Sequence, residues 1–269
     1  MEKTTSRKLT QLQEMLRKMK HVAIAFSGGV DSTFLVKIAY DVLGTNVVAV
    51  TAVSPTYPQW ELKEAQNLAQ TIGVPHTILQ SKEMNDPHFT KNTKNRCYYC
   101  KKELFVEIKK LAAKKNITYI LDGSTIDDTF DYRPGEKAIQ ELQIISPLKQ
   151  VGLTKTEIRK LSKQLGLPTW DKPSFACLAS RFPYGTKLTK SRLNQVEQAE
   201  TLLQSLGIEQ FRVRYHDKLA RIEVPQKDFQ LILKHSKTIV NQFKKLGFTY
   251  ITLDITGYRS GSMNEVLKL

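Results

Sequence analysis

The stretch Ser27-Gly28-Gly29-Val30-Asp31-Ser32 has the residue types of a phosphate-binding loop. It follows an apolar run over residues 21–26 and precedes a helical pattern over 33–43, which predicts a strand, a loop and a helix in that order. Glycines allow a phosphate to approach the backbone closely, and the start of a helix adds partial positive charge there. The two serine hydroxyls can donate to phosphate oxygens. Asp31 is itself an anion, so it suggests a Mg²⁺ ion between its carboxylate and the phosphates. A glycine turn with an Asp-Ser helix cap is the alternative interpretation.

All three cysteines of the chain lie outside the predicted core. Cys97 and Cys100 form a Cys-x-x-Cys pair at the start of a predicted helix, and Cys177 lies in a long predicted loop. Such a pair can bind one metal or form a disulfide. The pattern leaves four interpretations open: a redox disulfide, a zinc site with a histidine such as His76 or His88, a 4Fe–4S cluster on three thiolates, or three unrelated thiols.

Two arginines form a third candidate site. Arg212 and Arg214 lie two residues apart in a predicted strand, so their side chains share one face. Arg221 and Glu223 share a face of the next predicted strand. Converging guanidinium groups suit a phosphate, which they bind through paired hydrogen bonds. A strand face with cross-strand ion pairs is an equally good interpretation of the same pattern.

The first half of the chain alternates short apolar runs with helical patterns. The predicted strands are 21–26, 47–53, 77–79, 118–121 and 144–148; the predicted helices are 33–43, 59–72, 98–115 and one that begins at the capping box Thr154–Glu157. This alternation predicts an α/β fold with a doubly wound parallel sheet, whose ligand-binding loops gather at one edge. Asp128 follows a strand at that edge and is a candidate Mg²⁺ ligand together with Asp31, or a helix cap. The loops 81–96 and 169–184 are long, which is typical of functional loops.

The pattern changes after about Gly185. A helix at 191–206, strands at 211–215 and 219–224, a helical stretch at 227–245 and a strand at 248–255 predict a smaller α+β domain. We therefore expect a first domain at 1–185 and a second at 186–269.

Composition gives the broad class. The chain has 269 residues, of which 41% are hydrophobic, and a net charge of +15. It has no apolar run long enough for a membrane span and too few cysteines for a disulfide framework, so we expect a cytoplasmic protein with no membrane partner. The basic residues are spread along the chain without interleaved aromatic residues. The charge fits RNA, anionic metabolites or a solvated surface, and a solvated surface is at least as good an interpretation as nucleic-acid binding.

The loop at 27–32 resembles the SGGxDS signature of the PP-loop pyrophosphatases, which cleave ATP to AMP and pyrophosphate. Further stretches resemble the LarE family, the ATP-dependent sulfur transferases that make the nickel-pincer nucleotide of lactate racemase. They run in family order from residue 25 to 261, and comprise 25–32, Leu121-Asp122-Gly123, 131–135, 180–185, Arg212-Val213-Arg214, 220–223, Thr252-Leu253-Asp254 and Arg259-Ser260-Gly261.

This resemblance implies the PP-loop fold, which is adenine nucleotide alpha hydrolase-like, and an enzyme that adenylates a pyridinium dicarboxylate mononucleotide before converting it to a thiocarboxylate. It implies that Ser27, Gly28, Gly29, Asp31 and Ser32 bind Mg²⁺ and ATP, with Arg133 reaching the ATP phosphates. It further implies that Ser180, Arg212 and Arg214 bind the substrate phosphate near Cys177, and that Glu200 matches an acidic residue near that cysteine. The helical pattern around Glu200 predicts a surface position for its side chain.

Family members are of two chemical types. One sacrifices the sulfur of a single cysteine at the position of Cys177, and the other binds a 4Fe–4S cluster through three cysteines. Because this sequence has Cys97 and Cys100 in addition to Cys177, it resembles the cluster type. We accordingly expect ATP, Mg²⁺ and a 4Fe–4S cluster as cofactors, an unidentified sulfur donor as a partner, and a homo-oligomer.

Three other interpretations compete with this one. Sacrifice of Cys177 would deliver the sulfur without a cluster. A PP-loop tRNA thiolase would also use three cysteines and a basic surface, although no RNA-binding module is recognisable. A nucleotide-binding module without chemistry would release no pyrophosphate, which separates it from both enzymes.

Overall fold

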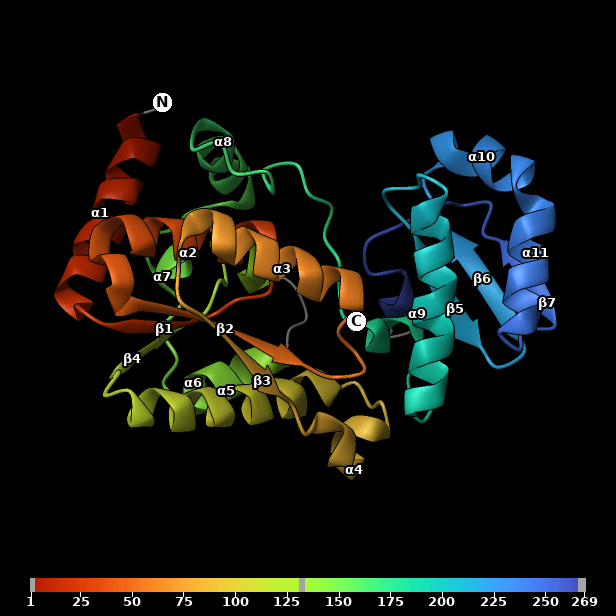
Figure 1. The fold of residues 1–269 in the computed structure, drawn as a ribbon, viewed down its shortest axis with the longest axis horizontal. Helices are drawn as coiled ribbons and strands as arrows, with labels where there is room; N and C mark the ends of the chain where they lie inside the picture. Colours follow the sequence, from red (N-terminus) through yellow and green to blue (C-terminus); the bar gives the residue numbers. More distant parts are fainter. Residues whose placement is uncertain (1–2, 131–133, 266–269) are drawn as a thin grey trace. The chain divides into compact units, whose positions relative to one another are not determined.

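The computed structural model describes residues 3–130 and 134–265 (Figure 1). The chain divides into two compact units. Unit 1 comprises residues 1–89 and 94–175, and unit 2 comprises residues 90–93 and 176–269. The sequence pattern changes near Gly185, but the turn Leu178–Arg181 already packs against a helix and a strand of unit 2. The short piece 90–93 joins unit 2 because the Asn92 side chain donates to the carbonyl of Pro183 at 2.9 Å.

Unit 1 is built on a parallel sheet with the strand order β3-β2-β1-β4. The strands are β1 (Val22–Ala25), β2 (Val47–Val53), β3 (His76–Gln80) and β4 (Tyr119–Leu121). Val22 is aligned with Val47 on one side and with Tyr119 on the other. The central strands β1 and β2 are almost continuously apolar and buried, as expected for a parallel sheet covered on both faces. This sheet confirms the predicted α/β fold.

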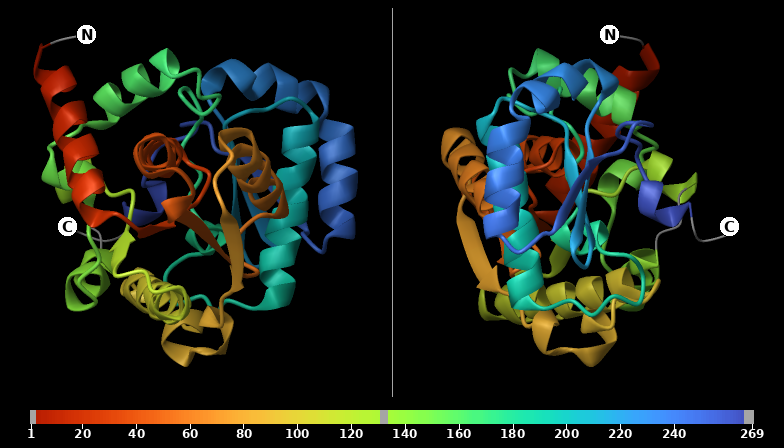
Figure 2. Two further views of the ribbon diagram at one scale, coloured as in Figure 1. Left: turned by 60° about the vertical axis from the view of Figure 1, so that its left-hand side comes forward. Right: turned by 90° about the vertical axis from the view of Figure 1, so that its right-hand side faces the viewer.

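Helices cover both faces of that sheet (Figures 1 and 2). One face packs against α1 (Lys3–Met19), α2 (Val30–Leu43), α3 (Gln59–Ile72) and α8 (Lys155–Gln164). The other face packs against α5 (Arg96–Lys114) and α6 (Gly135–Glu141). Gly73 ends α3 in the left-handed conformation with φ 84°, and the predicted capping box at Thr154 begins α8. Two short helices, α4 (Pro87–Thr90) and α7 (Pro147–Gln150), also lie in the part of the chain before Phe175.

The predicted strand at 144–148 is wrong. Only Ile145 pairs with the sheet, through a single bridge to Leu121, and α7 begins at Pro147. Proline has no N–H for a strand ladder, whereas its fixed φ suits the first position of a helix. The apolar run is buried, but it extends the sheet by this one residue only.

Unit 2 has a three-stranded sheet with the order β5-β6-β7. Strands β5 (Arg212–His216) and β6 (Leu219–Glu223) form an antiparallel hairpin, and β7 (Tyr250–Leu253) pairs with β6 in parallel. The helices α9 (Lys190–Ser205) and α11 (Ser236–Lys245) lie side by side (Figure 2). Buried apolar side chains of both helices and of the sheet form the core, among them Leu193, Leu203, Val213, Ile222 and Phe243. Unit 2 is thus an α+β structure.

The helical stretch predicted at 227–245 is divided in the structure. A 3-10 turn at Gln226–Asp228 leads into α10 (Phe229–Lys234), and α11 begins at Ser236 after a break at His235. Within the described residues, no helix combines the length and the apolar character that a membrane crossing requires.

Candidate active site

The Gly-rich loop lies between the end of β1 and the start of α2, as predicted. Gly28 has φ 67°, and a Cβ there would approach the Cβ of Ala65 to 3.1 Å. Gly29 is the N-cap of α2, and its carbonyl accepts the first helical hydrogen bond from the Thr33 amide at 2.9 Å. Gly28 thus packs closely on α3, and Gly29 begins α2, where the first amides have no partner within the helix.

Hydroxyl groups brace this loop internally. The Oγ atoms of Ser27 and Ser32 are 3.1 Å apart, and the Ser32 hydroxyl also donates to the carbonyl of Gly29 at 3.2 Å. Asp31 lies in the first turn of α2 and is partly exposed. The structure therefore brings together five of the predicted nucleotide-binding residues, Ser27, Gly28, Gly29, Asp31 and Ser32.

Residues outside the motif also contact the loop, and the sequence did not identify them. The Tyr57 hydroxyl donates to the carbonyl of Ser27 at 2.9 Å. The Lys172 ammonium donates to the carbonyl of Gly28 at 3.2 Å and pairs with Glu61 at 2.7 Å. The only sequence signal for Lys172 is its place in the long loop 169–184, and none marks Tyr57.

A buried carboxylate, Asp122, follows β4 directly. It accepts hydrogen bonds from the hydroxyls of Ser124 at 2.6 Å and Ser146 at 2.5 Å, and Lys101 of α5 lies 3.5 Å away. The next residue, Gly123, packs so closely on α2 that a Cβ there would lie 3.1 Å from the amide nitrogen of Ser32. The β4 loop is thus fixed against the Gly-rich loop.

The other two predicted residues of this region differ in their surroundings. Asp128 is buried; it accepts a hydrogen bond from the Thr125 amide at 2.9 Å and pairs with Lys155 at 3.0 Å. Asp128 thus caps the backbone amide at the start of the 3-10 turn Ile126–Phe130. Arg133 lies outside the described residues.

The cysteines are divided between the units. Cys97 and Cys100 lie in the first turn of α5 in unit 1, where Cys97 is exposed and Cys100 half-buried. Cys177 lies in unit 2, immediately before the turn Leu178–Arg181, and is half-buried. None of the three forms a disulfide in the described part of the chain. Among the described residues, no group of three or more His, Cys, Asp or Glu side chains is arranged to hold a metal ion.

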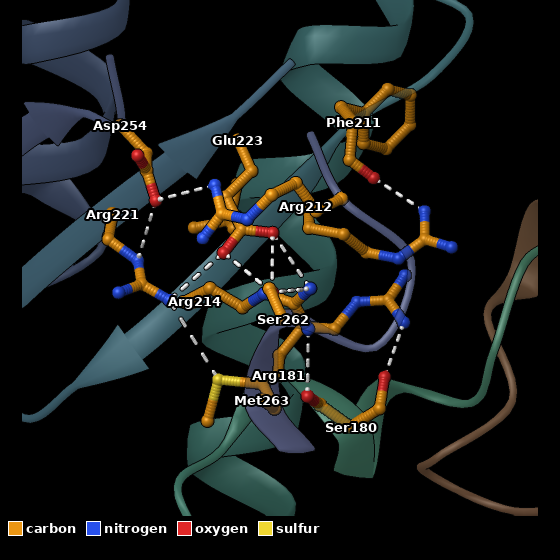
Figure 3. A network of polar contacts seen from close by, with 12 residues as sticks. Ser180, Arg181, Phe211, Arg212, Arg214, Arg221, Glu223, Asp254, Ser262 and Met263 are labelled. Carbon is orange, nitrogen blue, oxygen red and sulfur yellow. Dashed lines mark hydrogen bonds and ion pairs between the residues drawn. The ribbon is translucent and has the colours of Figure 1, made fainter. Parts of the chain in front are cut away.

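The structure brings Ser180 close to Arg214 in unit 2, in a network of buried charges (Figure 3). Arg214 donates to the Ser180 carbonyl at 2.9 Å, to Glu223 at 2.8 Å and to the Ser262 hydroxyl at 2.9 Å. Arg221 on β6 also pairs with Glu223, at 2.9 Å. Arg221 and Glu223 therefore share a strand face, as predicted, and Arg214 on β5 pairs with Glu223 across the two strands.

Arg212 lies on β5, as Arg214 does, and its side chain is buried, with the residue 3% exposed. It donates to the Phe211 carbonyl at 2.6 Å, and its guanidinium carbon lies 5.3 Å from the centre of the Tyr258 ring. Burial, together with the charge of Arg181, lowers the pKa of Arg212 to about 10, so the side chain stays positive at neutral pH. A buried cation of this kind favours an anionic ligand.

The turn after Cys177 is held by a second buried ion pair. Arg181 and Glu200 are both fully buried, and two parallel hydrogen bonds of 2.8 and 2.9 Å join them. The remaining Arg181 nitrogen, Nη1, donates to the carbonyls of Ala176 and Cys177 and to the Ser180 hydroxyl. Glu200 also accepts a hydrogen bond from the Val213 amide at 2.9 Å. Glu200 therefore binds the turn after Cys177 from a buried position, and the predicted surface position of its side chain is wrong.

Comparisons with known proteins agree with this geometry. Residues 1–132 match the family described as the PP-loop domain. The chain is 46% identical to an uncharacterized protein of Synechocystis sp., over 97% of this chain and 98% of that protein. It is 40% identical to the pyridinium-3,5-bisthiocarboxylic acid mononucleotide synthase of Lactiplantibacillus plantarum, over 98% of this chain and 96% of the synthase. A tRNA-specific 2-thiouridylase of Desulforamulus reducens is more distant, at 26% identity over 57% of this chain and 53% of that enzyme.

Proposed function

The chain belongs to the LarE family of PP-loop, ATP-using sulfurtransferases, and on that premise we propose that its substrate is a pyridinium dicarboxylate mononucleotide. In this proposal, the protein adenylates a substrate carboxylate and replaces one carboxylate oxygen with sulfur. The product serves nickel-pincer nucleotide synthesis. The observation that carries the proposal is the match over nearly the whole chain to a synthase of that product class, together with a Gly-rich loop at the start of α2.

The proposed reaction has two steps. A carboxylate oxygen of the substrate attacks the α-phosphorus of ATP, the bond to the β-phosphate oxygen breaks, and pyrophosphate leaves. A sulfide nucleophile then attacks the acyl carbon, the bond to the AMP oxygen breaks, and AMP leaves with that oxygen. Adenylation is needed because carboxylate oxygen is a poor leaving group, whereas AMP is a good one.

We assign the first step to the loop of unit 1. Its amides and the hydroxyls of Ser27 and Ser32 would bind the β- and γ-phosphates. Asp31 is partly exposed at the start of α2, where a carboxylate fits as a Mg²⁺ ligand. Asp128 fits less well because its carboxylate already serves Thr125 and Lys155. Arg133 keeps its proposed role at the ATP phosphates on the resemblance alone.

We assign binding of the substrate phosphate to Ser180, Arg212 and Arg214 in unit 2. Arg214 Nε is a buried nitrogen without a hydrogen-bond partner among the described residues. Arg212 adds a second buried positive charge on the same strand. A phosphate would supply oxygen acceptors and negative charge to both guanidinium groups.

The proposed resident cofactor is a 4Fe–4S cluster on Cys97, Cys100 and Cys177. The donor set fits in part: thiolates are the ligands that such a cluster takes, and Cys97 and Cys100 lie within one turn of α5. Cys177 belongs to the other unit, so its part in the set rests on the resemblance. When bound, a cluster on three thiolates leaves one iron open and would supply the sulfide. The sulfur donor that renews the sulfide is unidentified.

The decisive experiment measures pyrophosphate release and iron content on protein purified without oxygen. The parent should release pyrophosphate when it is given ATP and the mononucleotide, and Asp31→Ala should abolish that release while the thermal unfolding midpoint stays unchanged. Pyrophosphate release by Asp31→Ala near the parent rate would remove Asp31 from the metal site. Complete lack of release by the parent would favour a nucleotide-binding module.

The same preparation tests the cysteines. Each of Cys97→Ala, Cys100→Ala and Cys177→Ala should lose iron and visible absorption together. Retention of iron by Cys177→Ala alone would reduce the site to a two-cysteine pair. Loss of the elements of H₂S from Cys177 after one turnover, seen by mass spectrometry, would instead show that this cysteine is sacrificed. A salt-dependent shift of labelled tRNA would favour the thiolase alternative.

A further inference from the structure

Side chains from distant segments cap the carbonyl groups of the Gly-rich loop in unit 1. The carbonyls of the three successive residues Ser27, Gly28 and Gly29 accept hydrogen bonds from Tyr57, Lys172 and Ser32, at 2.9, 3.2 and 3.2 Å. Only Ser32 belongs to the loop motif. Tyr57 follows β2, and Lys172 lies 144 residues beyond Gly28 in the chain.

Lys172 is held in place by several contacts. Its ammonium pairs with Glu61 at 2.7 Å and with Glu64 at 3.0 Å, both on α3, and its side chain is 11% exposed. Arg159 of α8 donates to the carbonyls of Trp170 and Lys172, each at 2.8 Å, which fixes the backbone on either side of Asp171. The ammonium is therefore fixed beside Gly28 by α3 and α8.

Tyr57 remains a neutral hydrogen-bond donor. Burial, with the nearby charges of Glu61 and Glu64, raises the pKa of its hydroxyl well above the ordinary value of 10.0. The proton that is donated to the Ser27 carbonyl is consequently retained throughout the neutral and mildly alkaline range.

Capping of these carbonyls has a direct electrostatic consequence. A peptide carbonyl carries partial negative charge, and one that turned towards a bound phosphate would repel it. Donors that hold the carbonyls fix the orientation of the same peptide units, so their amides point the other way; of these, the Gly29 amide donates to the Ser27 hydroxyl at 3.4 Å. A loop that is fixed before binding also loses less conformational freedom when the anion arrives.

We propose that Tyr57 and Lys172 are positioning residues of the phosphate loop, which hold its carbonyls and so orient its amides for the β- and γ-phosphates of ATP. The inference rests on the proposed ATP-binding role of the loop. It adds two residues from outside the Ser27–Ser32 motif, and it assigns them selectivity for ATP over AMP, because AMP lacks the two outer phosphates.

The test compares Tyr57→Phe and Lys172→Met with the parent by calorimetric titration of Mg²⁺–ATP and of AMP. Tyr57→Phe should weaken ATP binding about fivefold, as expected for one neutral hydrogen bond, and Lys172→Met about tenfold or more, because its donor is charged. AMP binding should change by less than about twofold in both variants, since the loop contacts that are lost serve the outer phosphates.

Matched controls separate positioning from stability. Tyr119→Phe removes a hydroxyl from β4, and Lys8→Met removes another lysine paired with a glutamate in unit 1; neither side chain contacts the loop in the described contacts. Lys172→Met leaves Glu61 without its ammonium partner, so the double variant Lys172→Met/Glu61→Gln should restore the thermal midpoint without restoring the ATP affinity. Lys172→Arg keeps the charge and the reach and should restore ATP affinity in part.

Each outcome decides something different. If the parent binds ATP no better than AMP, the proposed function of the loop fails before the inference is tested. If the parent prefers ATP and both variants keep that preference, Tyr57 and Lys172 are not positioning residues. Equal weakening of ATP and AMP would assign them to general stability and would also overturn the inference.

Discussion

Breaking the buried pair between Arg181 and Glu200 should destabilise unit 2 strongly. Both side chains are fully buried, and two hydrogen bonds join them. Arg181→Met would leave the Glu200 carboxylate buried with only the Val213 amide as its described donor. Removal of one partner of a buried pair costs about 3–5 kcal/mol in the free energy of unfolding.

The double variant Arg181→Met/Glu200→Met gives the matched comparison. It removes both charges, and replacement of a whole buried pair by apolar side chains is often neutral. Three described losses remain: the Val213 amide loses its acceptor, the carbonyls of Ala176 and Cys177 lose a donor, and the Ser180 hydroxyl loses a donor. The losses at Ala176, Cys177 and Ser180 are common to both variants, so only the Val213 amide, at about 1–3 kcal/mol, offsets the gain from removing the unpaired Glu200 charge. The double variant should therefore be more stable than the single one by about 2 kcal/mol.

Hydrogen exchange at the amides of β5 and β6 is the appropriate assay. Both tryptophans, Trp60 and Trp170, lie in unit 1, so tryptophan fluorescence would not report on unit 2 directly. Exchange at Val213, whose amide donates to Glu200 in the parent, should be faster in the double variant than in Arg181→Met, because only the double variant removes this acceptor. In a background with Cys97→Ser and Cys100→Ser, Cys177 should also react faster with iodoacetamide, because its carbonyl has lost the Arg181 contact.

Two results would refute this reasoning. A loss of less than about 1 kcal/mol in Arg181→Met would mean that the Glu200 charge is well solvated after the substitution. A double variant no more stable than the single one would mean that packing volume, rather than charge, carries the effect.

Three further predictions concern pH, the phosphate site and the loop. Burial alone would raise the pKa of Glu157, but hydrogen bonds from Lys8 and the Thr154 capping box lower it to about 2. The ionised Glu157 side chain contributes about 1 kcal/mol to the free energy of unfolding after solvent screening. This contribution is fully present above pH 4.5 and is lost as the pH falls towards 2. The free energies of unfolding of the parent and of Glu157→Gln, measured by urea titration, should therefore converge near pH 2. Arg212→Ala should weaken binding of the phosphorylated substrate by about 1.5–3 kcal/mol, without affecting its dephosphorylated form; equal effects on both forms would assign Arg212 to structure. Gly28→Ala should lower stability more than Gly152→Ala, because both glycines have positive φ but only Gly28 lacks space for a Cβ; equal thermal midpoints would contradict this.

Local signals in the sequence were sufficient for much of the fold. The apolar runs that form β1 and β2 and the intervening helical pattern of α2 predicted the strand, loop and helix around Ser27–Ser32 correctly. Gly73 and the Thr154–Glu157 box predicted one helix end and one helix start. These signals are reliable because each depends on residues a few positions apart. The run at 144–148 failed because strand pairing depends on a partner elsewhere in the chain and Pro147 cannot donate to it.

The sequence by itself also determined the candidate chemistry: the residues of the Gly-rich loop, the cysteines, and two arginines on one face of a strand. Only the tertiary structure decided what surrounds them. It gave Arg214 the partners Glu223 and Ser262, and it joined Lys172 to Gly28 across 144 residues. Such partners have no local signature, because burial makes a charge find its counter-charge wherever the folded chain brings one within reach. The motif therefore identifies which groups can react, and the packing around it determines how they are held.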